Sequence, residues 1–227
     1  MMTPRDNYLR IKQEINDICA RCGRNPAEIT LLCVSKGYSW EEAQSVYDAG
    51  CRDFGENRLE EAINKMALAP EHINWHFIGS LQSNKVGKVI GRFSLIHSVD
   101  SVRLAEKISQ YSMASDVITP LLLQANTSGE PSKHGLSAEE WFQQFDKLLL
   151  LPNIKIEGLM TMAPFNGSVN VVRNCFKELR ILKERLAEKA GTRVELKYLS
   201  MGMSNDYKIA IEEGATILRI GTAIFKN

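Results

Sequence analysis

The alternation of apolar runs with helical patterns most constrains what this chain can fold into. Eight runs have the short, nearly continuous apolar character of strands buried on both faces, and helical patterns separate them. The runs cover residues 29–36, 51–55, 74–79, 93–99, 117–125, 154–162, 194–199 and 215–220. One further amphipathic helix, over residues 5–22, precedes the first run. An eightfold repeat of this kind favours a single (β/α)8 barrel with an extra N-terminal helix.

A doubly wound open sheet is the alternative fold for such a pattern. That fold often carries a Gly-x-Gly-x-x-Gly turn after its first strand. Here the first strand ends in Ser35-Lys36-Gly37, which favours the barrel. No linker, low-complexity tract or shift in composition divides the chain. We therefore expect one domain over residues 1–227.

Capping residues predict where the helices begin. Ser39 and Ser137 each stand three positions before a glutamate, Glu42 and Glu140, which is the spacing of a capping box. Further helices are expected to begin at Asp100 and at Ser204 or Asn205. Gly191 is expected to end the long helix before the seventh strand.

Composition excludes several classes of protein. The net charge of +1 gives no reason to expect a nucleic acid or an acidic membrane as a partner. The five cysteines are odd in number and scattered, which favours a reducing, cytoplasmic location over a disulfide framework. The pair Cys19 and Cys22 has no second pair to complete a metal site, so we interpret it as a plain helix end. No apolar run approaches the length of a transmembrane helix.

Two turns rich in small residues follow the last two predicted strands. The first covers residues 199–206 and the second covers residues 219–223. A strand that ends in a Gly/Ser/Thr turn before a helix presents backbone N–H groups to an anion. In (β/α)8 barrels, phosphate sites often lie after strands seven and eight. The two turns therefore predict a phosphate site, although Ser200, Ser204 and Thr222 could also be ordinary helix caps.

Three side chains at or inside predicted strands have both a functional and a structural interpretation. Lys36, at the end of the first strand, could form a Schiff base with an aldehyde or simply reach solvent. Arg219 is on the inward face of the last strand, where a guanidinium needs an acceptor. That acceptor could belong to a ligand or to a carboxylate in a structural salt bridge. His76, between Trp75 and Phe77, is more typical of a core residue than of a catalyst.

Several motifs in one register resemble the pyridoxal phosphate homeostasis protein family. They span residues 29–225: Val34-Ser35-Lys36, Phe54-Gly55-Glu56-Asn57, Trp75-His76-Phe77-Ile78-Gly79, Leu81-Gln82-Ser83-Asn84-Lys85, Ile96-His97-Ser98-Val99-Asp100, Asn126-Thr127-Ser128-Gly129-Glu130 with Lys133 and Gly135, Glu157-Gly158-Leu159-Met160, Leu199-Ser200-Met201-Gly202-Met203-Ser204 and Arg219-Ile220-Gly221-Thr222-Ala223-Ile224-Phe225. The chain departs from the family pattern at Gly37-Tyr38-Ser39, at Arg58-Leu59 and at Ser80. The first departure predicts a looser turn around Lys36.

The resemblance implies a barrel similar to the N-terminal domain of alanine racemase, with pyridoxal 5′-phosphate as its cofactor. Lys36 matches the family's Schiff-base lysine, and Arg219 matches the arginine that faces the pyridine nitrogen. The remaining matches are Ser200, Gly221 and Thr222 in the phosphate cup, Met201 through its backbone, and Asn57 and His76 beside the cofactor ring.

The resemblance and the sequence together favour a carrier over an enzyme. We expect a cytoplasmic monomer that binds pyridoxal phosphate, buffers it and delivers it to apoenzymes, without robust catalysis. The alternative is an amino-acid racemase of the alanine racemase type, which needs a second acid–base group from a C-terminal domain. The sequence stops directly after the eighth strand, so we expect no such domain. A cofactor-free Schiff-base aldolase would need an acid–base partner for Lys36 that the sequence does not identify.

Overall fold

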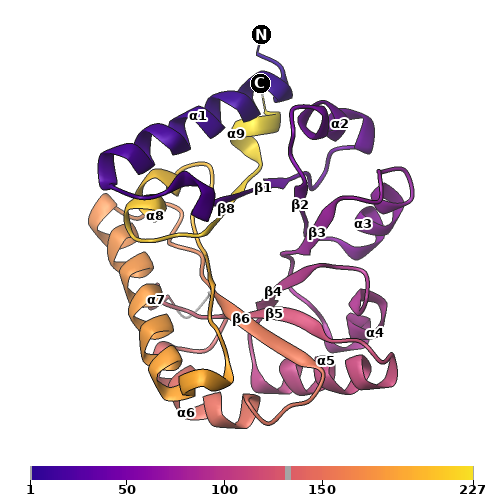
Figure 1. The fold of residues 1–227 in the computed structure, drawn as a ribbon, viewed down its shortest axis with the longest axis vertical. Helices are drawn as coiled ribbons and strands as arrows, with labels where there is room; N and C mark the ends of the chain where they lie inside the picture. The colour runs from indigo at the N-terminus through magenta and orange to yellow at the C-terminus, as the bar shows by residue number, and fades with distance from the viewer. Residues whose placement is uncertain (1, 131–133, 227) are drawn as a thin grey trace.

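The computed structural model describes residues 2–130 and 134–226; Lys133, part of one motif above, lies outside them. Eight parallel strands form a closed barrel in sequence order, and β1 pairs with β8 to close the ring (Figure 1). The strands are β1 (Thr30–Val34), β2 (Asp53–Glu56), β3 (Asn74–Phe77), β4 (Leu95–Val99), β5 (Thr119–Gln124), β6 (Ile154–Met160), β7 (Tyr198–Ser200) and β8 (Ile217–Ile220). The barrel predicted from the eightfold alternation is confirmed.

Helices surround the strand ring, as Figure 1 shows. They are α1 (Pro4–Cys22), α2 (Trp40–Asp48), α3 (Leu59–Met66), α4 (Val86–Val89), α5 (Val102–Ala114), α6 (Ala138–Leu148), α7 (Val169–Ala190), α8 (Tyr207–Glu212) and α9 (Thr222–Phe225), with 3-10 turns η1 (Pro26–Glu28), η2 (Ser83–Lys85) and η3 (Gly191–Arg193). The extra helix α1 lies beside α9, where the Asn7 amide donates to the carbonyl of Ile224. The first and last parts of the described chain therefore pack together.

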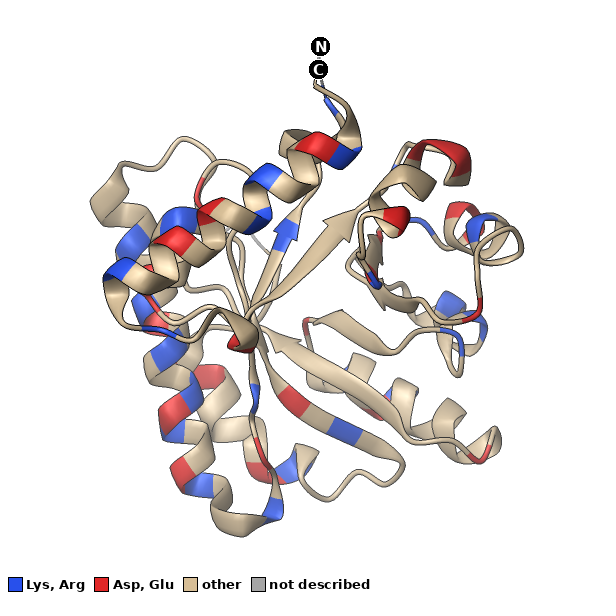
Figure 2. Cartoon of the chain, turned by 45° about the horizontal axis from the view of Figure 1, so that its top comes forward, with Lys and Arg blue, Asp and Glu red and all other residues tan. Residues whose placement is uncertain are grey.

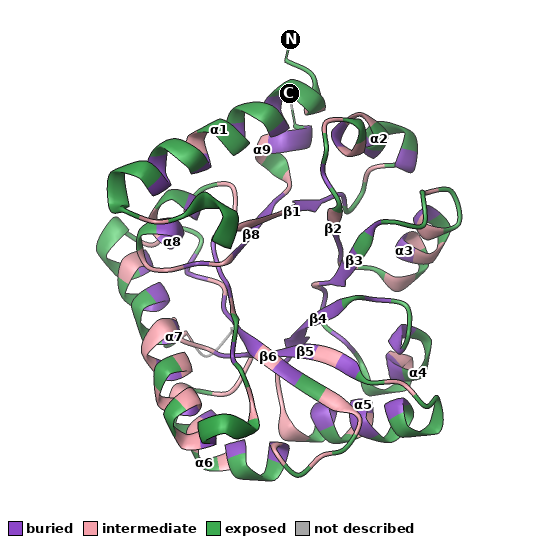
Figure 3. Cartoon of the chain, viewed as in Figure 1, coloured by how far each residue is buried: buried purple, intermediate pink, exposed green. Residues whose placement is uncertain are grey.

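The hydrophobic core has two layers. The larger layer lies between the strands and the helices, and the smaller fills the barrel interior with Leu32, Leu95, Leu122, Met160 and Ile217. Figure 3 shows the strands as mostly buried and the helices as buried on their inward faces only. The strands are apolar on both faces because both faces are covered.

Capping follows the sequence at some helices and differs at others. Ser39 and Ser137 form the predicted capping boxes, and Gly191 ends α7. The expectation for Asp100 was wrong: the adjacent Ser101 caps α5, with its hydroxyl accepting from the amide of Leu104. The expected cap at Ser204 or Asn205 was also wrong, because Asp206 occupies that position.

The surface has no single dominant charge. Blue and red segments alternate along α1 and α7 in Figure 2. Within the described residues, no helix is long and apolar enough to cross a membrane.

Candidate functional site

Lys36 and the last small-residue turn stand at the same end of two neighbouring strands. β1 and β8 are paired, with Leu32 beside Arg219 and Cys33 beside Ile220. Lys36 follows β1 and is exposed, while Gly221 and Thr222 follow β8 directly. The backbones approach so closely that a Cβ on Gly221 would lie 3.0 Å from the Val34 carbonyl oxygen. The carboxyl-terminal ends of parallel strands carry the chemistry of such barrels, so this pairing defines the candidate site.

The turn that carries Lys36 is held by contacts of its own. The amide of Tyr38 donates to the Ser35 carbonyl at 3.1 Å, and the Tyr38 ring stacks on Phe225 with 4.6 Å between ring centroids. Gly37 adopts a left-handed conformation with φ of 77°. The unusual Gly37-Tyr38-Ser39 segment is thus anchored to α9 through the Tyr38 ring, and the looser turn around Lys36 stays a prediction.

A buried polar cluster lies behind Lys36. The Ser35 hydroxyl donates to Glu56 Oε1 at 2.6 Å, and Lys65 Nζ donates to the same oxygen and to the Ser35 carbonyl, both at 2.5 Å. All three residues are buried. Because Ser35 precedes Lys36, the cluster fixes the backbone from which Lys36 projects.

The two predicted turns are joined to each other. Gly202, in the first turn, has φ of 93°, and a Cβ there would lie 2.6 Å from the Cβ of Ala210, so only glycine fits. The Ser204 hydroxyl accepts from the amide of Ala223 in the second turn at 3.1 Å. The N–H groups of Gly221 and Thr222 have no acceptor among the described residues. These two amides are therefore available to an anion.

Arg219 is a buried cation with neutral partners. Its guanidinium donates to the carbonyl and the hydroxyl of Ser200, both at 2.7 Å, and to the carbonyl of Thr161 at 2.8 Å. Among the described residues no carboxylate forms a direct salt bridge with Arg219, but the nearby Asp206 carboxylate favours its charged form and raises its pKa. Burial lowers the pKa of Arg219 to about 10, which still leaves it charged at neutral pH.

Ser200 and His76 are linked through a residue that the sequence analysis did not single out as a candidate. Ser200 Oγ lies 2.8 Å from His97 Nδ1, and His97 Nε2 lies 2.9 Å from His76 Nδ1. His76 borders a pocket of about 220 Å³ whose other lining residues, such as Thr30, Asp53 and Asn74, begin strands. His76 is therefore inside the barrel near its amino-terminal end, on the side away from the strand end that carries Lys36.

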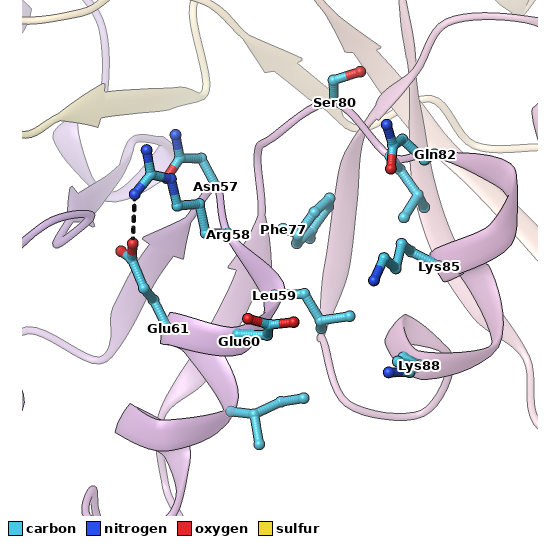
Figure 4. Close-up of a pocket in the computed structure, with 12 residues that line it drawn as sticks. Asn57, Arg58, Leu59, Glu60, Glu61, Phe77, Ser80, Gln82, Lys85 and Lys88 are labelled. Atoms are coloured by element: carbon cyan, nitrogen blue, oxygen red, sulfur yellow. Dashed lines mark hydrogen bonds and ion pairs between the residues drawn. The ribbon is translucent and has the colours of Figure 1, made fainter.

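Asn57 lines a separate cavity of about 480 Å³ outside the strand ring. The cavity lies between α3 and the η2–α4 segment, and Phe77, Gln82, Lys85 and Lys88 also line it. Figure 4 shows Asn57 at one edge of this cavity, next to the ion pair between Arg58 and Glu61. The backbone of Asn57 also passes close to Gly79, two residues after the end of β3. A Cβ on Gly79 would lie 2.1 Å from the Asn57 carbonyl oxygen.

The predicted residues thus fall into four places, because His76 lies near the amino-terminal end of the barrel and Asn57 lines the cavity outside the strand ring. Lys36, Gly221 and Thr222 stand together at the mouth, and Ser200 and Arg219 lie below them in the barrel. The backbone amide of Met201 donates to the Ile217 carbonyl, so that N–H is already used. Side chains alternate between the two faces of a strand, so the inward Leu95 could have pointed to His97 as an inward residue. The pairing of Glu56 with Lys65 has no such signal in the sequence.

The donor set fits a molecule with an aldehyde, a phosphate and a basic ring nitrogen. An exposed amine can condense with an aldehyde, free amides can hold a phosphate, and a buried cation can face a neutral ring nitrogen. Within the described residues, no group of three or more His, Cys, Asp or Glu side chains could hold a metal ion. The groups that the site offers to such a molecule are the Lys36 amine, the amides of Gly221 and Thr222 and the Arg219 guanidinium.

The fold and the two turns define a barrel of the alanine racemase type: the family model "Alanine racemase, N-terminal domain" matches residues 8–227. An alanine racemase structure from Clostridium difficile has a TM-score of 0.78 at 17% identity, and the match covers 96% of this chain and 56% of that one. At this identity the likeness shows the fold alone.

The sequence relatives are more specific. The pyridoxal phosphate homeostasis protein of Aquifex aeolicus is 40% identical over 217 residues, which are 95% of this chain and 94% of that protein. The structure of PipY from Synechococcus elongatus with PLP bound has a TM-score of 0.82 at 34% identity and covers 93% of this chain and 99% of that one. The chain belongs to the pyridoxal phosphate homeostasis protein family.

Proposed function

We propose that this chain binds pyridoxal 5′-phosphate as a Schiff base on Lys36 and maintains the supply of this cofactor. The observation that best supports the proposal is the pairing of β1 with β8, because Lys36 and the free amides of Gly221 and Thr222 follow these adjacent strands at the same end. The PLP-bound relative and the name of the curated relatives support the same cofactor. In this proposal the protein buffers the cofactor and delivers it to apoenzymes in the cytoplasm, acting as a monomeric single domain.

Each site residue has a role in this proposal. Gly221 and Thr222 hold the phosphate through their amides, with Ser200 and Met201 close below them, and Arg219 faces the pyridine nitrogen. For Asn57 and His76, the match to positions beside the cofactor ring stays a prediction: His76 reaches the site only through His97 and Ser200, and Asn57 lines the cavity beside α3. When bound, the cofactor supplies an electron sink, which a protonated ring nitrogen strengthens. The Arg219 cation disfavours that protonation, which suits a protein that holds the cofactor without consuming it.

The racemase alternative gains no specific support from the site. The alanine racemase structures share the fold at 15–17% identity, and such a racemase needs a second acid–base group opposite the lysine. Incubation of the loaded protein with L-alanine tests this alternative directly. Formation of D-alanine at an enzyme-like rate would favour the racemase over the carrier.

The test of the carrier function is transfer of the cofactor. The loaded protein is mixed with a pyridoxal-phosphate-dependent apoenzyme, and recovered activity is measured against free cofactor at the same concentration. We expect recovery from the wild type, and loss of the bound cofactor's absorbance in Lys36→Ala. A matched control is Lys155→Ala, which removes a lysine from the outer part of β6. A wild-type chain that cannot be loaded would overturn the proposal.

A further inference from the structure

A row of polar side chains crosses the barrel interior from Arg219 to Asp53. Arg219 contacts Ser200, Ser200 contacts His97, and His97 contacts His76, at 2.7, 2.8 and 2.9 Å. His76 Nε2 then lies 3.6 Å from Asp53 Oδ1. His97 and Ser200 are fully buried, and His76 and Arg219 are about 95% buried. Such a buried row is costly unless every polar atom finds a partner.

Only one direction of hydrogen bonds satisfies the whole row. Arg219 can only donate, so Ser200 Oγ accepts from it. If His97 Nδ1 carries no proton, it accepts the Ser200 hydroxyl hydrogen, and its Nε2–H donates to His76 Nδ1. His76 then carries its proton on Nε2, which faces the Asp53 carboxylate at 3.6 Å, an electrostatic contact longer than a hydrogen bond. With neutral rings, the opposite direction leaves the Ser200 hydrogen without an acceptor and turns a nitrogen lone pair toward Asp53.

The surroundings of His97 favour its neutral form. Burial, together with the nearby His76 and Arg219, holds the pKa of His97 well below its usual range. The ring is therefore an uncharged imidazole at neutral pH, with one nitrogen free to accept. The charged Arg219 and Asp53 at the two ends of the row decide which nitrogen that is.

We propose that His97 is a positioning residue for the cofactor site. Its unprotonated Nδ1 holds the Ser200 hydroxyl hydrogen away from Arg219, so that the lone pairs of Ser200 Oγ face the guanidinium. Arg219 then has three fixed acceptors and is held in one orientation. The inference rests on the proposed function, in which Arg219 faces the ring nitrogen of pyridoxal phosphate. His97 itself is fully buried and acts through Ser200.

The first experiment uses the cofactor-free full chain. Nitrogen NMR of the protein labelled at histidine reports which ring nitrogen of His97 carries the proton, and loss of the signal in His97→Asn assigns it. We expect a neutral ring with the proton on Nε2. A proton on Nδ1, or a charged ring at neutral pH, would overturn the proposal without any reference to the cofactor.

The second experiment compares three variants by titration with pyridoxal phosphate and by the absorption spectrum of the bound cofactor. His97→Leu removes the acceptor, and we expect about tenfold weaker binding and a changed spectrum. His97→Asn places an amide oxygen near the former Nδ1, so we expect binding within about threefold of the wild type. Thr119→Val removes a comparable buried hydrogen bond, to Ser112, outside the row, and we expect no change in either measurement.

The outcomes separate the inference from the proposed function. A wild type that binds the cofactor, together with a His97→Leu variant of unchanged affinity and spectrum, would overturn the role of His97 and leave the proposed function intact. A wild type that does not bind would overturn both. If His97→Leu fails to fold, the NMR measurement on the wild type and the spectrum of the folded His97→Asn variant still decide the matter: a changed His97→Asn spectrum would contradict the proposal.

Discussion

Lys65 and Glu56 form a buried ion pair directly behind Lys36, with 2.5 Å between Nζ and Oε1 and side chains that are 7% and 0% exposed. The second carboxylate oxygen, Oε2, has no hydrogen-bond partner among the described residues, and burial raises the pKa of Glu56. The hydrogen bonds from Lys65 and Ser35 therefore offset the cost of burying the Glu56 carboxylate. This makes the pair a sensitive support for the backbone that carries Lys36.

Lys65→Met should destabilise the protein by about 3–5 kcal/mol, because it leaves the Glu56 carboxylate buried without its cation. The double variant Glu56→Gln with Lys65→Met should recover most of that loss, since neither charge remains. Urea unfolding followed by circular dichroism measures both. Lys155→Met, which removes an exposed lysine from its pair with Glu157, serves as the control and should leave the unfolding midpoint near that of the wild type. A change below about 1 kcal/mol for Lys65→Met would contradict the prediction.

Tyr38→Ala should weaken pyridoxal phosphate binding several-fold, because the stack on Phe225 ties the Lys36 turn to α9. An aromatic pair of this kind contributes about 0.5–1.5 kcal/mol beyond its buried area. Tyr38→Phe keeps the ring and should bind as the wild type does. Titration by absorbance compares the two variants. Equal affinities for Tyr38→Ala and Tyr38→Phe would show that the stack does not support the turn.

Gly202→Ala should destabilise the protein by about 2–4 kcal/mol, since it combines a left-handed backbone with a Cβ that meets Ala210. Gly50→Ala is the matched control: its φ is 100°, but nothing lies within 4 Å of the place that a Cβ would occupy there. Only the backbone cost of about 1 kcal/mol should remain at that position. Thermal unfolding of both variants separates the two effects. Similar losses in both would mean that the contact with Ala210 relaxes freely.

Acid should destabilise the junction between α1 and α8 through Glu14. The Tyr207 hydroxyl donates to its carboxylate at 2.5 Å, and Lys208 and Arg10 are also paired with it. The Tyr207 hydrogen bond, with help from these cations, lowers the pKa of Glu14 from 4.5 to about 2. A lowered pKa means that the carboxylate contributes stability above pH 4.5 and that this contribution is lost as the pH falls toward 2.

Glu14→Gln removes that titration, so its unfolding free energy should fall less than that of the wild type between pH 6 and pH 3. Urea unfolding at the two pH values measures the difference. Glu184→Gln, at a carboxylate that is 60% exposed, is the control and should follow the wild type. If the unfolding free energy of Glu14→Gln falls as much between pH 6 and pH 3 as that of the wild type, groups other than Glu14 cause the loss.

Much of the fold could be predicted because strands buried on both faces leave a continuous apolar signal. The eight runs predicted eight strands, although the observed β7, Tyr198–Ser200, overlaps the expected region 194–199 only at Tyr198 and Leu199. Local chemistry also predicted the capping boxes at Ser39 and Ser137. It failed where two cap-forming residues are adjacent, as at Asp100 and Ser101, because propensity alone does not choose between neighbours.

The site could be predicted only in part. Lys36 and the two turns stand at strand ends, and strand ends are recognisable along the sequence. The contact between His97 and Ser200 is not recognisable in this way, because it depends on how far one strand is staggered against another across the barrel. His76 illustrates the same limit: its inward direction follows from alternation, but its height in the barrel does not.

The pairing of β1 with β8 also sets the order in which the site can be assembled. Lys36 leaves the ribosome early, whereas Arg219, Gly221 and Thr222 are among the last residues described. Until β8 docks, the lysine has no amides or guanidinium opposite it, and the long intervening loop must be closed at a cost in entropy. Stable retention of a cofactor would therefore require a closed barrel, so that ligand binding and completion of the fold occur together.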